Sequence, residues 1–215
     1  MRALERTIRR MLLALPLLVA SAPAGEQPAR MGEAFAVAAP AENKPQYYAR
    51  AAWSAGAKCW LVVWQDGVPT DDGTNGEGPA QNVMAVRVAA EGKVLDAKPI
   101  AVSAAKGSQL RPAVASDDKG WLVVWHDFRN GKDWDVCGSR VTGDGKVLDQ
   151  DGALLSGGEH NQCFPDIVFG AGNYYVAWLD MRGWPEYRVY GSRVSPEGKA
   201  LDGTGVEMIR VMSDK

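Results

Sequence analysis

Two stretches of the sequence carry the same set of acidic, basic and aromatic residues, and these could bind a ligand. The set comprises Asp127, Arg129 and Trp134 in the first stretch and Asp180, Arg182 and Trp184 in the second. A flat aromatic ring can stack on a sugar ring, and a guanidinium group can bond two oxygens at once. We therefore predict a binding surface at these six residues, with a polysaccharide or a protein surface as its partner.

The same residues also have a structural interpretation. Trp134 and Trp184 could pack against a neighbouring unit of the fold. The acid also occurs upstream as Asp66, and another arginine recurs in three places, namely Arg87, Arg140 and Arg193. A feature present in every repeat usually serves the repeat, so an ion pair or a hydrogen-bonded tie is expected within each unit. A ring of charges at one end of a channel is the functional alternative.

An enzyme is the second hypothesis, as a glycoside hydrolase or lyase that uses two carboxyl groups about 5–10 Å apart. The sequence offers many acids but no distinguishable pair, so we assign no catalytic residue and expect a non-catalytic protein. No G-x-S-x-G motif is present, and His126 and His160 are the only imidazoles. Leu179 replaces His126 in the next repeat, which indicates a packing position.

A metal or cofactor is not predicted. Two His residues and the absence of C-x-x-C give no zinc set. One acidic loop, with Asp71 and Asp72 at its centre, holds oxygen ligands that could bind Ca²⁺. Its spacing does not match the known calcium-loop pattern, so a solvated acidic loop is the favoured interpretation.

The elements that must position these residues are repeats. Residues 109–149 match residues 162–202 at 15 of 41 positions without a gap, at an offset of 53. An earlier copy contains Trp60-Leu-Val-Val-Trp64-Gln-Asp66 and Gly92-Lys-Val-Leu-Asp96, with an insertion after Asp66 that is rich in Gly, Pro, Asn and Asp. The repeats therefore occupy about residues 44–103, 104–156 and 157–215.

Each repeat is expected to form four short strands. In the second repeat the first strand begins near Pro112, the second is the apolar run 121–125, the third is 135–141 and the fourth runs from Lys146 to Ser156. Glycine follows an acid between the third and fourth strands, as in Asp144-Gly145, where a turn requires positive φ. Repeated four-stranded units of this length are typical of a β-propeller, so the fold class is all-β with three antiparallel blades.

The repeated motifs W-L-V-V-W-x-D-x-R, D-V-x-G-x-R-V and G-K-V-L-D resemble the tandem repeats of large secreted bacterial propeller-type proteins. The resemblance covers about residues 45 to 213. It implies an architecture but no particular activity, because such repeats are mostly uncharacterised. The first copy departs from the pattern, since Val68 stands where Arg129 and Arg182 stand later.

Three blades are fewer than the four to eight of closed propellers. We consider an open stack, a truncated product or fragment of a longer repeat protein, and completion by oligomerisation, for example as a homodimer with six blades. Repeat units need covered ends, so association is favoured over an open stack. A strand-like segment, Glu33–Val37, precedes the first repeat within an N-terminal segment, residues 25–43.

Residues 1–24 predict a signal peptide. Four Arg precede an apolar run, residues 11–20, and Ala22 and Ala24 form the A-x-A pattern before a cleavage site. The run is too short to span a bilayer, and no other stretch is long enough. The expected location is therefore secreted or periplasmic, with no membrane span.

The charge excludes one class of partner. The whole chain has a formal net charge of −2, and removal of the signal peptide leaves 20 basic and 25 acidic residues. A nucleic-acid binder needs a basic surface, so nucleic acid is not an expected partner.

Three cysteines are present, Cys59, Cys137 and Cys163. Export permits disulfides, and Cys137 with Cys163 is the first pair to consider because they lie on consecutive repeats. Three unpaired, buried thiols are the alternative. Taken together, the sequence predicts an exported binding or interaction module, with the hydrolase or lyase and the fragment as alternatives.

Overall fold

The computed structural model describes residues 36–37, 45–67 and 81–210. Twelve strands form three four-stranded antiparallel sheets, and no helix occurs in these described ranges. The first sheet contains β1 (Gln46–Ser54), β2 (Cys59–Asp66), β3 (Asn82–Ala89) and β4 (Ile100–Ser103). The second contains β5 (Gln109–Ser116), β6 (Gly120–Asp127), β7 (Asp135–Thr142) and β8 (Ala153–Ser156). The third contains β9 (Gln162–Gly170), β10 (Asn173–Asp180), β11 (Arg188–Val194) and β12 (Val206–Arg210).

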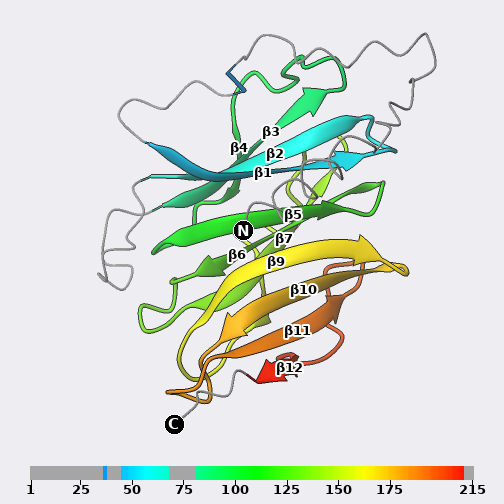
Figure 1. Ribbon diagram of the computed structural model, residues 1–215. Helices are drawn as coiled ribbons and strands as arrows, with labels where there is room; N and C mark the ends of the chain where they lie inside the picture. Colours follow the sequence, from blue (N-terminus) through cyan, green and yellow to red (C-terminus); the bar gives the residue numbers. More distant parts are fainter. Residues whose placement is uncertain (1–35, 38–44, 68–80, 211–215) are drawn as a thin grey trace, which may run out of the picture. The chain divides into compact units, whose positions relative to one another are not determined.

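The strands of each sheet lie side by side in the order in which they occur along the chain. The sheets follow one another in space as they do in sequence, and the first strands β1, β5 and β9 are neighbours (Figure 1). The all-β fold with three antiparallel, propeller-type blades is therefore confirmed.

Two hydrophobic cores lie between the blades. Trp121, Val123 and Trp125 of β6 pack on Leu61 and other residues of the first sheet. The opposite face of β6, with Leu122 and Val124, packs on the third sheet. All eight residues of β6 are buried, which explains why this strand is apolar at consecutive positions instead of alternating. Each fully buried Leu or Val contributes about 1.5–3 kcal/mol relative to an exposed one.

The fourth strand is shorter than the sequence predicted. In the second blade β8 covers only Ala153–Ser156, and Val147 forms a single bridge with Val141. A turn closed by a hydrogen bond from Gly145 N to Thr142 O precedes Val147, and a second turn, closed by Gly152 N to Asp149 O, separates Val147 from β8. Gly145 has φ +88°, so the positive φ predicted for this turn is present.

Several sequence expectations fall outside the described residues. These are the signal peptide, the acidic loop with Asp71 and Asp72, and most of the segment 25–43 with its strand. Of that segment only Ala36 and Val37 are described, and they are not in a strand. None of the described residues forms a helix that could cross a membrane.

Candidate functional site

The predicted residues Asp127 and Arg129 form a clamp at the end of β6. Arg129 Nη2 lies 2.6 Å from Asp127 Oδ2, and Trp125 Nε1 donates to the same carboxylate at 2.8 Å. Arg129 also donates to the backbone carbonyls of Asp151 and Gly152. The Asp127 side chain has no exposed surface, and Arg129 connects it to the turn before β8.

Asp180 and Arg182 repeat this clamp in the third blade. Arg182 Nη2 lies 2.6 Å from Asp180 Oδ2, and Trp178 Nε1 donates to that oxygen at 2.9 Å. Burial raises the pKa of Asp180, but the hydrogen bonds from Arg182 and Trp178 outweigh it, and the pKa lies below its ordinary value. Both predicted acids are thus buried and already paired with an arginine.

The two predicted tryptophans differ in exposure. Trp134 is half-buried and packs its ring at 4.7 Å from His126 and 5.0 Å from Phe128, centroid to centroid. Trp184 is 56% exposed and contacts His160 and Tyr187. Trp184 is therefore the one of the six predicted residues with a large exposed surface at which a ligand could stack.

The recurring arginines pair with the Asp that ends the G-K-x-L-D motif. The three pairs are Arg87–Asp96, Arg140–Asp149 and Arg193–Asp202, at 2.6–2.7 Å. Arg87 Nη1 also donates to Gly143 O of the next blade at 3.0 Å. This arginine set accordingly forms ties within a blade, and in the first blade a tie between blades.

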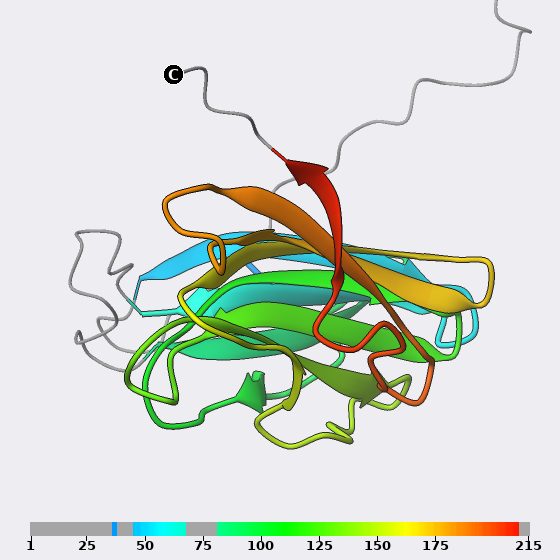
Figure 2. The same cartoon turned by 90° about the horizontal axis from the view of Figure 1, so that it is seen from below.

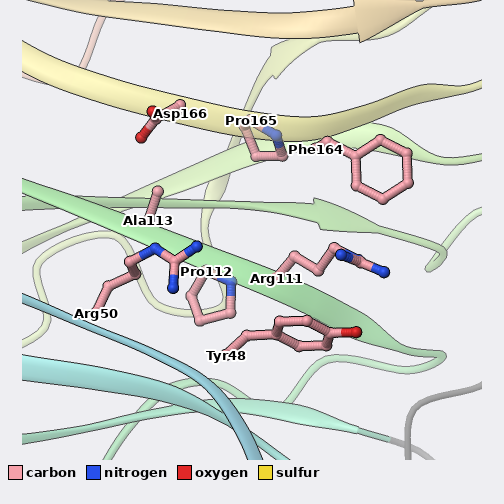
Figure 3. Close-up of a pocket in the computed structure, with 8 residues that line it drawn as sticks. All are labelled: Tyr48, Arg50, Arg111, Pro112, Ala113, Phe164, Pro165 and Asp166. Atoms are coloured by element: carbon pink, nitrogen blue, oxygen red, sulfur yellow. The ribbon is translucent and has the colours of Figure 1, made fainter. Parts of the chain in front are cut away.

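A pocket that the sequence did not indicate lies on the first strands of the three blades (Figure 3). Its lining comes from β1, β5 and β9 and comprises Tyr48, Arg50, Arg111, Pro112, Ala113, Phe164, Pro165 and Asp166. We call it the first-strand pocket. Its volume is about 210 Å³.

An arginine lies between two aromatic rings in this pocket. The guanidinium carbon of Arg111 is 4.3 Å from the centroid of the Tyr48 ring and 4.7 Å from that of Phe164. Such cation–π contacts fix the guanidinium and contribute about 0.5–2 kcal/mol. Phe164 is still 47% exposed, and the neighbouring Arg50 and Asp166 are exposed.

The three residues of this stack occupy equivalent positions with the same unusual backbone. Tyr48, Arg111 and Phe164 have φ of 54°, 51° and 55°. Strand pairing is interrupted at the same place in each blade, as expected for a β-bulge that re-aims a side chain. Non-glycine residues at positive φ cost roughly 1–2 kcal/mol each and cluster at functional sites.

Side chains of the preceding blade hold two of these bulges. Gln65 Oε1 accepts a hydrogen bond from Arg111 N at 3.2 Å, and His126 Nδ1 accepts one from Phe164 N at 3.1 Å. Gln65 and His126 are equivalent residues of β2 and β6. Burial and, to a smaller extent, Arg111 lower the pKa of His126 to about 3, so its ring is neutral and can accept. His126 is therefore a positioning residue as well as a packing residue.

A second cavity lies between loops of the second and third blades. It is lined by Phe128, Lys132, Asp133, Glu159, His160 and Asn161 and has a volume of about 380 Å³. We call it the loop cleft. Trp184 lies near this cleft, because its ring centroid is 6.5 Å from that of His160, which lines the cleft. The loop cleft therefore adjoins the predicted loop surface.

The cysteines are all free and buried, so the pair Cys137–Cys163 is not formed. Cys137 packs in the core between the first and second blades. Burial raises the pKa of Cys137 and of Cys163 to about 12. No cluster of three or more metal-ligating His, Cys, Asp or Glu side chains is found within the described part of the chain.

Comparison with known proteins gives a likeness in fold alone. No family model matches, and no curated protein matches. A family 43 endo-arabinanase from Bacillus licheniformis is 12% identical, with a TM-score of 0.46, over 76% of this chain and 59% of that one. An endo-arabinase from Bacteroides thetaiotaomicron is 12% identical, with a TM-score of 0.48, over 77% of this chain and 62% of that one. A family 117 glycoside hydrolase from Zobellia galactanivorans is 10% identical, with a TM-score of 0.49, over 77% of this chain and 55% of that one. The chain thus spans less than two thirds of the length of each.

Proposed function

We propose that this chain is an exported, non-catalytic binding module whose first-strand pocket takes a sugar residue of a polysaccharide. The observation that carries the proposal is the Tyr48–Arg111–Phe164 stack, built on three equivalent bulges. An aromatic ring with exposed surface suits the apolar face of a sugar. A guanidinium held between two rings is oriented before a ligand arrives, which reduces the entropy lost on binding.

The size and charge of the pocket limit the kind of ligand that it can bind. A volume of about 210 Å³ is below the roughly 300–1,000 Å³ of pockets for drug-sized molecules, so a single ring fits better than an extended one. Arg50 and Arg111 are donors, and Asp166 is an acceptor. This combination of donors and an acceptor can form hydrogen bonds with the hydroxyl groups of a sugar or with a carboxylate on the same sugar.

The pocket gives little support to hydrolysis. Of the described residues that line it, only Asp166 carries a carboxyl group, whereas glycoside hydrolysis uses two. The acids that recur in the second and third blades, Asp127 and Asp180, are buried in clamps with Arg129 and Arg182. These observations favour binding over catalysis.

The proposal is tested by measuring polysaccharide binding with the purified chain on a glycan array, followed by calorimetry. A lost charge-assisted hydrogen bond costs about 1.5–3 kcal/mol, so Arg111→Ala should weaken binding about tenfold or more. Trp184→Ala is the matched control, since Trp184 is also an exposed aromatic residue but lies at the loop surface. If Trp184→Ala abolished binding and Arg111→Ala left it unchanged, the ligand would lie on the loop surface predicted from the sequence.

One observation favours a second candidate function. The loop cleft is lined by two acids, Asp133 and Glu159, which makes it the better location for a glycoside hydrolase or lyase. A panel of fluorogenic glycosides tests this alternative. Turnover that is lost in Asp133→Asn or Glu159→Gln, but kept in Asp166→Asn, would support hydrolysis at the loop cleft.

A further inference from the structure

The outer face of the third blade exposes a group of apolar side chains beside the acid Asp166. Val168 is 61% exposed, Tyr175 is 37% exposed and Met208 is 49% exposed, and these side chains come from β9, β10 and β12. Figure 2, seen from below, has the third sheet in front. Soluble monomers rarely leave a contiguous apolar sheet face open to water.

Much of this face corresponds to a face that is already an interface. Ala115, Leu122 and Leu155 of the second blade lie in the core between the second and third blades. The residues 53 positions later are Val168, Tyr175 and Met208, whereas Ala113 of the same core corresponds to the exposed Asp166. The third blade thus presents outward the side chains that its neighbour uses for packing.

The opposite end of the stack is better covered. Trp64, Val86 and Val88 of the first blade are 4%, 1% and 5% exposed, and Val37 packs against their cluster. Trp60 on the same face is 41% exposed, so the two ends differ in degree, and the third blade is the more open end.

The open face is not built to receive another blade in the way the inner faces are. At the two inner junctions Gln65 and His126 accept the bulge N–H group of the next first strand. Leu179 occupies the equivalent position on β10 and has no acceptor. A further blade with the same bulge would leave a buried N–H group without a partner, which disfavours that contact. Two apolar sheet faces packed on each other avoid that unpaired group.

We propose that the outer face of the third blade binds the same face of a second copy of this chain, as a two-fold dimer. Four strands about 4.8 Å apart and about 7 residues long give a face of about 440 Å². Two such faces bury about 900 Å², near the lower limit of about 1,000 Å² for a specific interface. An interface of this size is expected to be weak, so the dimer should form with increasing concentration.

Analytical ultracentrifugation of the chain from 1 to 200 μM tests the interface. The expected result is a monomer that converts to a dimer with concentration. Val168→Glu and Met208→Lys should each raise the dissociation constant at least tenfold. Leu154→Glu is the matched control, because Leu154 is 62% exposed but lies on the second blade. Circular dichroism checks that each variant is folded, and the two variants guard against one of them failing to fold.

Three results would overturn this interface. The first is a wild-type chain that stays monomeric at 200 μM, and the second is assembly beyond two copies, because an isologous contact closes at a dimer. The third is that Trp60→Glu weakens the dimer as much as Val168→Glu does. Trp60 is an exposed residue on the first blade, so that result would indicate head-to-tail contact. None of these results depends on polysaccharide binding.

Discussion

His126 on β6 accepts a hydrogen bond through Nδ1 from the backbone N–H of Phe164 on β9, at 3.1 Å. The two residues belong to different blades, and their rings also meet edge to face, with centroids 5.5 Å apart. A buried side chain of one blade therefore fixes the backbone of the residue that the next blade contributes to the first-strand pocket. The pocket depends on blade packing as well as on its own lining residues.

The chain itself suggests how to test this relationship. Gln65 performs the same task in the first blade, and Leu179 stands in that position in the third. We expect His126→Gln to keep both stability and ligand binding. His126→Leu should lower the free energy of unfolding by about 1–3 kcal/mol, because the Phe164 N–H loses its acceptor. The measurement is the rate of amide hydrogen exchange at Phe164, which should be faster in His126→Leu and unchanged in His126→Gln. Equal exchange rates in the two variants would contradict the assignment.

Stability should fall in mild acid because of His126. Its pKa is lowered from 6.5 to about 3 by burial, so the unfolded chain binds a proton that the folded chain does not. The free energy of unfolding should therefore keep its full value above pH 6.5. Below pH 6.5 it should fall by about 1.4 kcal/mol per pH unit, down to about pH 3. Urea unfolding at several pH values checks this slope. His126→Gln should remove the part of the slope that lies above the pH range in which the carboxyl groups, such as Asp180, titrate. An unchanged slope in that upper part would contradict the assignment.

The Asp127–Arg129 clamp is expected to be structural. Asp127→Ala leaves the guanidinium of Arg129 and the indole N–H of Trp125 without their acceptor. Breaking a buried pair in this way costs about 3 kcal/mol. Asp166→Asn, at an exposed acid of the first-strand pocket, should leave the melting temperature unchanged. A normal melting temperature in Asp127→Ala would instead return Asp127 to the set of candidate ligand-binding residues.

The thiols should be unreactive until the chain unfolds. Cys59, Cys137 and Cys163 are buried, and burial raises the pKa values of Cys137 and Cys163 to about 12, so little thiolate forms at pH 8. Ellman's reagent should label no cysteine in the folded chain and three in urea without a reductant. A count of one in urea would show a disulfide, which the folded geometry does not contain.

The sequence predicted the architecture well because the information is periodic. The repeat of Trp125 as Trp178 and of Gly145 as Gly198 locates the same strand and the same turn in successive blades. The second strand was assigned from its consecutive apolar residues, and all eight residues of β6 are indeed buried. The fourth strand was drawn too long because pairing with β7 stops after the bridge at Val147, and Asp149 to Gly152 form a turn that periodicity does not reveal.

The pocket was missed because its residues differ between the copies. Tyr48, Arg111 and Phe164 are equivalent in backbone, but a search for identical residues discards a position that changes in every repeat. A usable signal is present next to it. Pro112 and Pro165 are equivalent in the two repeats, but the residue before each differs in chemistry, arginine in one and phenylalanine in the other. The neutral, accepting role of His126 could not be read from sequence, since it depends on burial and on a partner in another blade.

The most direct test of the central claim is to find where a bound sugar changes the protein. Backbone amide shifts of the isotope-labelled chain would be followed by NMR during titration with an oligosaccharide that binds on the array. We predict that the largest shifts lie at Tyr48, Arg111 and Phe164, and that they disappear in Arg111→Ala. Shifts confined to the residues around Trp184 and His160, and unaltered in Arg111→Ala, would contradict binding at the first-strand pocket.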